Sequence, residues 1–398
     1  MPTYIRIYFY SFLLAPFYAY LISNELLLVP YYFLGSISMI LFLFLFTQKK
    51  IHIPPYIYPL ILFAAYYSIW DFFNGRYEQF GIIKLIFKNY PLHILAVLLI
   101  IENINFDKKF IKNLLTGFKI LIILSFIFTL IQVIYNPFFF TTEQASAFDL
   151  AYEVFDIRNT SIWAFLSPLD VGLSFLPMLA IVLGYTIDRK MYKQFLFFLG
   201  IGALVAVFTN SRWTILNMMV LLLPLLFLIK GKRIKTFLIT GLGLIIVITI
   251  VNNLFSFLGF DLSAYFEGRI LSNTAESRLL AIDLFKEFFP KNPFFGSGIR
   301  VDLDLSRALA GRSSQIHVGY LSSLYEFGLV GSIFLFSFWL QLFRRLFNNS
   351  KIHKQYFLIF GFACFLLSNL TLVEYSIFHI GLLLIIIFDR FYLAHNNR

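Results

Sequence analysis

The sequence predicts an all-α, polytopic membrane protein with about twelve membrane-spanning helices and one large loop outside the membrane. Hydrophobic residues make up 60% of its 398 positions, against about 45–50% in soluble proteins. Only 13% of the residues are charged, 52 are Phe, and the mean hydropathy is +0.81. A water-soluble fold of this size could not bury so much apolar surface. The chain is therefore expected to lie in lipid.

Apolar runs long enough to cross a bilayer core of about 30 Å define the expected helices. They lie at 8–28, 30–47, 56–73, 85–101, 113–136, 162–187, 195–210, 213–230, 236–257, 317–343, 356–372 and 375–393. Two of these runs are short (85–101 and 195–210), so eleven or thirteen spans are alternatives. The first run has no small-residue cleavage site and is interpreted as an anchor. Residues 1–398 are expected to form a single integral membrane domain.

The basic residues predict the orientation of this bundle. With the N-terminus in the cytoplasm, every even-numbered link between spans is short and basic, as cytoplasmic loops are. Both termini are then cytoplasmic. The net charge of +11 follows from this topology and does not indicate a nucleic-acid partner. Cys364 is the only cysteine, so an intramolecular disulfide is excluded.

Residues 258–316 form the longest polar stretch, and we expect this outer loop to carry part of the active site. A helix start is indicated by Asn273 and by Glu276 three residues later. This helix should end at Pro290. At about 100° per residue, Arg278 shares a stripe with three apolar residues, Ile282, Phe285 and Phe289. A charge on such a stripe needs an anion, which is either a structural partner or headgroup, or a bound phosphate.

Three other short segments contain residue types that can bind phosphate or metal ions. The turn that ends in Arg212, between two predicted spans, suits either a headgroup anchor or a phosphate contact. The stretch 292–298 contains two glycines but lacks the Lys-Ser pair of a nucleotide-binding loop. Asp302 and Asp304 have a metal-binding spacing without a strand context, so no metal site is predicted.

His317 opens the predicted span 317–343, at the point where the polar loop meets a packed helix. That position suits a proton acceptor, although a lone histidine is often structural. Gly328 and Gly331 fall on its stripe and should let a neighbouring helix approach closely. Glu374, in the short link between the last two spans, is the candidate to orient the imidazole.

These segments resemble the O-antigen ligase and polymerase superfamily. Residues 317–331 resemble its motif H-N-x-Y-L-x-x-L-x-E-x-G-x-x-G, and Ser211-Arg212 resembles its Ser-Arg pair. Arg278 followed by Pro293-Phe294-Phe295-Gly296-Ser297-Gly298 resembles its R…P-x-x-G-x-G stretch. The agreement keeps order and spacing over about residues 200–345. Val318 stands where the family usually has Asn, which weakens a ligase assignment more than the superfamily assignment.

The resemblance implies a GT-C-like glycosyltransferase of the bacterial inner membrane. Such an enzyme takes glycan from undecaprenyl pyrophosphate on the periplasmic face and passes it to an acceptor hydroxyl. The expected substrate-binding residues are Arg212 and Arg278 for the pyrophosphate, Arg158 and Arg300 for phosphate or glycan, and Tyr320 for sugar. The expected catalytic residues are His317 as base and Glu374 as its orienting partner. No metal or cofactor is expected, because a pyrophosphate leaves as a stable anion.

Three functions follow from this reasoning. The favoured one is an O-antigen polymerase of lipopolysaccharide biosynthesis, which extends a lipid-linked repeat unit. The second is a ligase that transfers finished glycan to lipid A core. The third, a lipid-linked sugar transporter, fits poorly because the charges gather at one face and not near the midplane. The expected partners are the carrier-linked oligosaccharide, membrane lipid and a chain-length regulator, and no nucleic acid.

Overall fold

Helices form the regular structure of this protein. The computed structural model describes residues 1–22, 29–48, 51–73, 89–136, 139–140, 162, 174–209, 212–225, 241–242, 245, 249, 276–298, 316, 318–370 and 380–396. The helices within these ranges are α1 (Thr3–Ile22), α2 (Val29–Gln48), α3 (Tyr58–Phe73), α5 (Tyr90–Asn103), α6 (Lys108–Ile134), α8 (Leu176–Asp188), α9 (Tyr192–Phe208), α10 (Arg212–Val220), α14 (Glu276–Phe288), α16 (Gly319–His353), α17 (Tyr356–Ser368) and α18 (Ile380–Asn396). Short 3₁₀ turns, η1 (Pro55–Ile57) and η3 (Phe289–Lys291), precede α3 and follow α14. No strand occurs within the ranges given above.

The order of these helices follows the apolar runs of the sequence. Each predicted run except 236–257 overlaps one of the helices, and most of that run lies outside the described residues. Within the described part, α6 and α16 are long and apolar enough to cross a membrane. Shorter apolar helices are Leu34–Thr47, Tyr90–Asn103, Leu176–Asp188, Tyr192–Phe208 and Tyr356–Ser368. The all-helical fold class is confirmed, whereas twelve membrane crossings stay a prediction.

Polar caps fix where several helices begin. Asp107 accepts a hydrogen bond from the Phe110 N–H (2.8 Å), which caps α6. The same carboxylate binds the Arg6 guanidinium at 2.9 Å, so α1 and α6 begin at the same end of the bundle. Asn89 caps α5 through the Leu92 N–H (3.2 Å), with Pro91 in the first turn.

The core of the bundle centres on α8 and α18. All residues from 176 to 184 in α8 and from 381 to 389 in α18 are buried. Helix α8 packs against α6, α9, α17 and α18. A helix that is apolar and covered on all sides occupies the middle of a bundle. Both helices therefore lack the amphipathic stripe of a surface helix.

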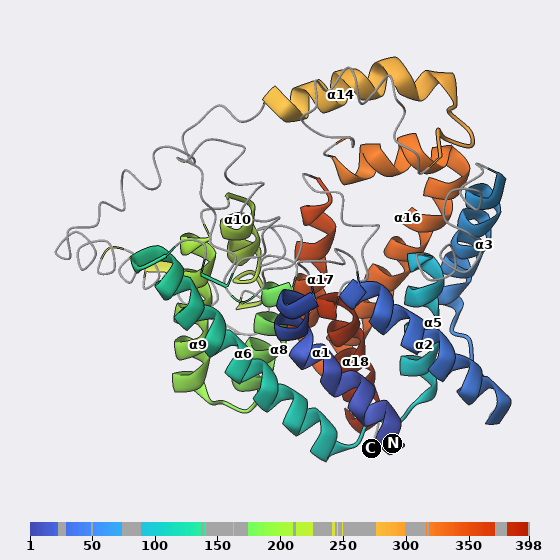
Figure 1. The fold of residues 1–398 in the computed structure, drawn as a ribbon. Coiled ribbons are helices and arrows are strands. Elements are labelled where there is room, and N and C mark those ends of the chain that lie inside the picture. The colour runs from blue at the N-terminus through green and yellow to red at the C-terminus, as the bar shows by residue number, and fades with distance from the viewer. Residues whose placement is uncertain are drawn as a thin grey trace.

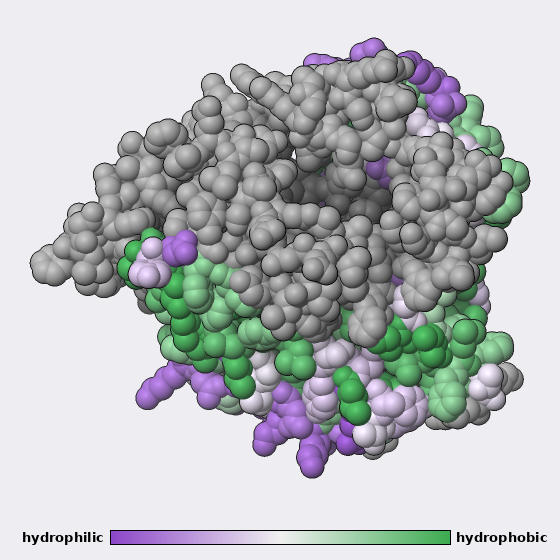
Figure 2. All heavy atoms as spheres, viewed as in Figure 1, coloured by the Kyte–Doolittle hydropathy of each residue, from purple (hydrophilic) through white to green (hydrophobic). Residues whose placement is uncertain are grey.

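The outside of the bundle carries large apolar side chains. Exposed examples are Ile7, Leu14, Ile40, Leu43, Phe46, Leu62, Ile69, Ile120, Ile127, Leu196, Phe197, Ile333 and Leu340. In Figure 2, hydrophobic side chains form a band across the described surface, and hydrophilic ones lie below it and over α14 above it. Apolar surface of this extent suits lipid and not water. The arrangement is consistent with a membrane protein.

The two ends of the bundle differ in what they carry. Figure 1 shows α14 lying across the top of the molecule, while both chain termini lie at the bottom. We call the end with α14 the loop end and the opposite end the terminal end. Helix α14 was predicted to run to Phe289 and stop at Pro290; the observed α-helix ends at Phe288, one residue earlier, and the 3₁₀ turn η3 carries the chain through Pro290.

Helix α16 changes direction at Gly328. This residue has φ 63° and ψ −170°, which is not a helical conformation and which essentially only glycine adopts. The segment before the break, Gly319–Phe327, lies across the loop end beneath α14, and the remainder descends through the bundle (Figure 1). We call Gly319–Phe327 the first segment of α16. The predicted stripe treated this helix as continuous, which is wrong at Gly328.

Candidate functional site

The loop helix α14 packs onto the start of α16. Its buried face consists of Ala281, Leu284 and Phe288, which cluster with Ile316 and Tyr325. Each of these five side chains is at most 4% exposed. Ile316 immediately precedes the predicted base in the chain. The apolar contact therefore fixes the loop helix beside the chain segment that leads into α16.

The buried face of α14 differs from the predicted one. Ile282, which the prediction placed on the buried stripe, is 37% exposed, whereas Ala281 and Leu284 are buried. The observed face is rotated from the predicted stripe by about 100°, one residue step around a helix. Asp283 and Lys286 are exposed, as expected, and pair with each other at 3.5 Å. The side chain of Arg278 lies outside the described part, so its place on the buried stripe stays a prediction.

The stretch 293–298, which we call the loop turn, inserts into the break of α16. In an unbroken helix the amides of Leu329 and Val330 would donate to the carbonyls of Tyr325 and Glu326. Here they donate to two loop-turn carbonyls, Pro293 O (2.9 Å) and Phe294 O (3.1 Å).

The two helix carbonyls left by this exchange also find partners in the loop turn. Ser297 N–H donates to Tyr325 O (2.8 Å), and Gly298 N–H donates to Glu326 O (3.0 Å). Four hydrogen bonds to the loop turn thus replace two within the helix. The break is stable because none of these four backbone groups is left unpaired.

Two glycines permit the backbones to approach so closely. Gly296 (φ 76°) and Gly328 (φ 63°) have left-handed backbone angles. A Cβ atom on Gly296 would overlap the Glu326 carbonyl, and one on Gly328 would overlap the Phe294 carbonyl. Gly328 was predicted to admit a neighbouring helix, but it admits the loop turn. Gly331 does face a helix, since a Cβ there would overlap the ring of Tyr66 on α3.

Tyr320 is the predicted site residue whose side chain the structure describes. Its hydroxyl donates to the Leu366 carbonyl of α17 (2.7 Å), and its ring packs edge-on against Phe336, with 5.6 Å between centroids. These contacts tie the first segment of α16 to the end of α17. The predicted contact of Tyr320 with sugar stays a prediction.

The other predicted site residues are only partly placed. Arg212 is the first residue of α10 and Arg278 the third of α14, but neither side chain is described. His317, Glu374, Arg158 and Arg300 lie outside the described residues. Their predicted roles therefore stay predictions, and only the elements beside them carry structural evidence.

Those neighbouring elements converge at the loop end. Helices α14 and α17 both pack against α16, and α10 packs against α17. Asn217, in α10 five residues after Arg212, donates to the Ser368 hydroxyl of α17 (3.0 Å). Helix α17 ends at Ser368, six residues before Glu374. The helix ends next to Arg212, His317 and Glu374 are thus held together by direct contacts.

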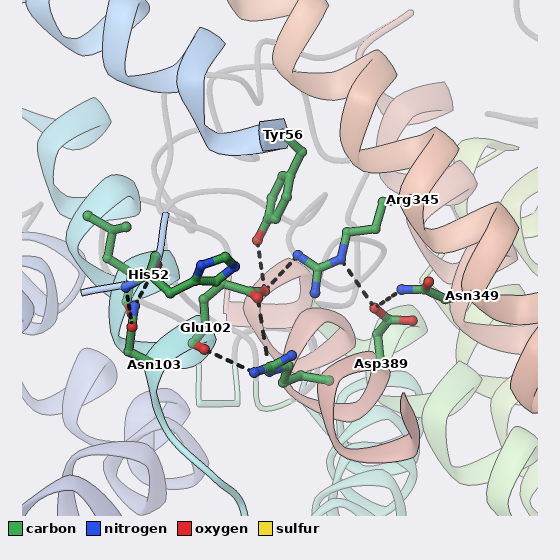
Figure 3. A network of polar contacts seen from close by, with 9 residues as sticks. His52, Tyr56, Glu102, Asn103, Arg345, Asn349 and Asp389 are labelled. Atoms are coloured by element: carbon green, nitrogen blue, oxygen red, sulfur yellow. Dashed lines mark hydrogen bonds and ion pairs between the residues drawn. The ribbon is translucent and has the colours of Figure 1, made fainter. Parts of the chain in front are cut away.

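A second group of titratable residues lies at the terminal end (Figure 3). The buried carboxylate of Glu102 on α5 pairs with Arg345 of α16 at 2.6 Å and accepts a hydrogen bond from Tyr56 at 3.0 Å. The Arg345 guanidinium also lies over the Tyr56 ring, 4.4 Å from its centroid. Arg390 of α18 donates to the Glu102 carbonyl at 3.2 Å. Glu102 therefore connects four segments of the chain.

Asp389 completes this group, which we call the terminal network. Its carboxylate accepts from Asn349 (2.8 Å), lies 3.0 Å from His353 Nε2 and 3.7 Å from Arg345. His353 Nδ1 accepts from the Gln355 N–H (3.2 Å), so the proton of a neutral imidazole lies on Nε2, toward Asp389. Each carboxylate has several donors, which is typical of a structural network and not of a vacant ligand site.

Sequence reasoning missed the terminal network because it interpreted Arg345 and Arg390 only as signs of orientation. The available signal was a carboxylate at or near the end of an apolar run, at Glu102 and Asp389, since buried charges there need partners. Among the described residues, no group of three or more His, Cys, Asp or Glu side chains is placed to hold a metal ion.

Comparison with known proteins separates the two regions. Residues 195–336 match the O-antigen ligase family. This segment includes most of α9, all of α10 and α14, the loop turn and the first segment of α16, whereas Glu102, Arg345 and Asp389 lie outside it. No curated protein matches the chain significantly. The match confirms the resemblance to the O-antigen ligase and polymerase superfamily and favours the loop end as the functional site.

Proposed function

Because residues 195–336 match the O-antigen ligase family, we propose that this protein is a polysaccharide polymerase of the bacterial inner membrane. It transfers glycan from undecaprenyl pyrophosphate to a hydroxyl of a second lipid-linked repeat unit, on the periplasmic face. The observation that supports this most is the convergence at the loop end of α10, α14, α16 and the end of α17. These are the elements that carry or adjoin the predicted site residues.

The proposed reaction is a single displacement at the anomeric carbon of the donor glycan. The acceptor oxygen forms a new bond to this carbon while the bond to the pyrophosphate oxygen breaks, and the electron pair leaves with the pyrophosphate. His317 takes the proton of the acceptor hydroxyl, a contribution of about 10²–10⁴-fold. Glu374 accepts from the other ring nitrogen of His317 and so keeps the attacking-side nitrogen free for that proton.

The leaving group needs charge stabilisation and no general acid, because pyrophosphate is a stable anion. Arg212 and Arg278 supply planar guanidinium groups that bind its oxygens in bidentate fashion. They come from separate helices, α10 and α14, so a clamp forms only when the loop helix is docked. The packing of Leu284 and Phe288 on the start of α16 supports such docking. Arg158, Arg300 and Tyr320 are secondary contacts to phosphate or sugar.

A purified-enzyme assay with synthetic pyrophosphate-linked repeat units tests this function. Wild-type protein should convert single repeats into longer lipid-linked chains, and His317→Ala should lower turnover by about 10²-fold or more. His395→Ala, at the terminal end, is the matched control and should keep full turnover. Full turnover of His317→Ala would remove the base assignment. Full donor use by both Arg212→Lys and Arg278→Lys would remove the clamp.

The ligase is the second candidate, because the matched family carries that name. Val318 favours the polymerase, since it replaces the Asn usual beside the motif histidine. Offering the enzyme two acceptors, a lipid-linked repeat unit and lipid A core, discriminates the two. Transfer to the repeat unit alone supports a polymerase, and transfer to lipid A core alone shows a ligase.

A further inference from the structure

Tyr66 on α3 joins the two backbones that meet at the break of α16. Its hydroxyl lies 2.8 Å from the Phe295 carbonyl of the loop turn and 2.8 Å from the Phe327 carbonyl that precedes Gly328. A phenol has one proton, so the two carbonyl oxygens share it. This side chain therefore holds the loop turn and the end of the first segment of α16 at one point.

The ring of Tyr66 is itself held in place on both sides. It stacks on Trp70 of α3 with 6.3 Å between centroids and meets Phe334 of α16 edge-on at 6.4 Å. Gly331 leaves the space that the ring fills. Trp70 in turn contacts the ring of Phe295, with 6.2 Å between centroids. Packing around the ring thus fixes the position of the hydroxyl.

Tyr66 belongs to the half of the chain that the family match does not cover. The match begins at residue 195, whereas the loop turn and the break of α16 lie inside it. Helix α3 packs directly against α16, as Figure 1 also shows. The N-terminal half therefore contacts the matched motifs through a specific polar group as well as through apolar packing.

We propose that Tyr66 is a positioning residue, which locks the loop turn into the break of α16 and so sets the direction of the first segment. This inference rests on the proposed function, in which His317 is the base. Only Val318 separates His317 from the first segment, so the direction of the segment affects the position of His317. The segment is about two and a half turns long, so a rotation of a few degrees at Gly328 displaces its far end by about 1 Å. A misplacement of about 1 Å can cost on the order of 10²-fold in rate.

The kinetic signature of this role is a fall in kcat with little change in KM for the donor. The pyrophosphate ligands Arg212 and Arg278 lie on α10 and α14, which the hydroxyl of Tyr66 does not contact. Tyr66→Phe removes the shared proton and keeps the ring. We expect its kcat to fall about tenfold, within the range for misplaced catalytic groups. Its thermal unfolding midpoint should stay near that of wild type.

Tyr58→Phe is the matched control. Tyr58 lies on the same helix, is 53% exposed, and should tolerate the change with unaltered kcat. We call the hydrogen-bonded contact between the loop turn and residues 325–330 of α16 the joint. Hydrogen exchange measured by mass spectrometry reports on it directly. In Tyr66→Phe, exchange should accelerate in peptides covering 293–298 and 325–330, while a peptide covering 281–288 keeps its protection. The first two peptides contain the amides that bridge the loop turn and α16, and the third does not.

Gly296→Ala is a second variant that disturbs the same joint from the loop side. If both changes act through one joint, the double variant should lose less kcat than the product of the single losses. Faster exchange with unchanged kcat in Tyr66→Phe would make the joint purely structural and overturn the proposal. Unchanged exchange together with unchanged kcat would overturn it as well. The His317→Ala measurement judges the proposed function separately, because it does not alter the joint.

Discussion

The two ends of α16 are held by opposite kinds of interaction. At Gly328, near the loop end, backbone hydrogen bonds, two glycines and one neutral hydroxyl join the helix to the loop turn. At Arg345, toward the terminal end, buried carboxylates, guanidinium groups and an imidazole join the helix to α5 and α18. The charges of the terminal network already have partners. The contacts of the joint are neutral, so an anionic ligand could bind near it without displacing an ion pair.

This difference explains why the more conspicuous titratable cluster is not the proposed site. Buried charged groups often mark active sites, but structural ion-pair networks give the same signal. The terminal network connects α5, α16 and α18 and lies outside the segment that matches the O-antigen ligase family. It anchors the lower part of α16, while the joint orients the upper part. Changes in the terminal network should therefore lower stability, whereas changes at the break of α16 should lower turnover.

The largest effect on stability should come from Arg345→Met. Removing this guanidinium leaves the carboxylates of Glu102 and Asp389, both at most 3% exposed, without their shared cation. Breaking a buried pair in this way costs about 3–5 kcal/mol. We expect a large fall of the thermal unfolding midpoint in detergent. Arg344→Met changes the exposed neighbour and should have little effect.

The turnover of the same variant shows whether the terminal network takes part in the reaction. Arg345→Met protein that remains folded should keep the wild-type kcat, because its change lies far from the loop end. A loss of kcat without a loss of stability would mean that the terminal network takes part in the reaction. That result would contradict the assignment of the reaction to the loop end.

A smaller loss of stability but a larger loss of turnover is expected for Gly328→Ala. Holding alanine in this backbone conformation costs about 1–3 kcal/mol, and its Cβ would also overlap the Phe294 carbonyl. Gly200→Ala is the control, since a Cβ there meets no atom within 4 Å. Circular dichroism on heating and the polymer assay would measure both effects. Equal behaviour of the two alanine variants would show that the break tolerates a side chain.

The loop helix and the bundle could be predicted from the sequence because both depend on local patterns. Apolar runs and turn residues fixed the order of the helices, and Pro290 marked the end of α14. The rotation of its buried face could not be predicted, because α14 is short and several of its positions are apolar. Only contact with Ile316 and Tyr325 decides which of them is covered.

The break of α16 and the terminal network depend on contacts between distant residues. Gly328 alone is compatible with a helix, and only the loop turn, some 30 residues earlier, reveals why it is not helical. Tyr66 lies 261 residues from Phe327, so nothing near it in the sequence indicates its hydrogen bonds. Arg345 fits the basic pattern of a cytoplasmic link equally well whether it is free or paired. Long-range pairing of this kind is not encoded in local spacing.

Tyr320→Phe should have a modest effect on stability. The change removes one hydrogen bond to Leu366 O and keeps the ring against Phe336. A neutral hydrogen bond contributes about 0.5–1.5 kcal/mol, and the Asn369 N–H still donates to the same carbonyl at 3.3 Å. Chemical unfolding of the variant beside wild type gives the difference. A change in KM for the acceptor glycan would instead support a contact of this hydroxyl with sugar.

The smallest effect is expected for Arg6→Ala, which removes the ion pair with Asp107 at the terminal end. The two side chains are 40% and 35% exposed, so water and salt screen their attraction, and such pairs contribute about 0–1 kcal/mol. Asp107 still caps α6 through the Phe110 N–H. The unfolding midpoint should therefore change little, and any difference from wild type should shrink as salt is raised from 0.05 to roughly 0.5 M. A loss as large as that of Arg345→Met would contradict this expectation, because Arg6 pairs with one half-exposed carboxylate whereas Arg345 is shared by two buried ones.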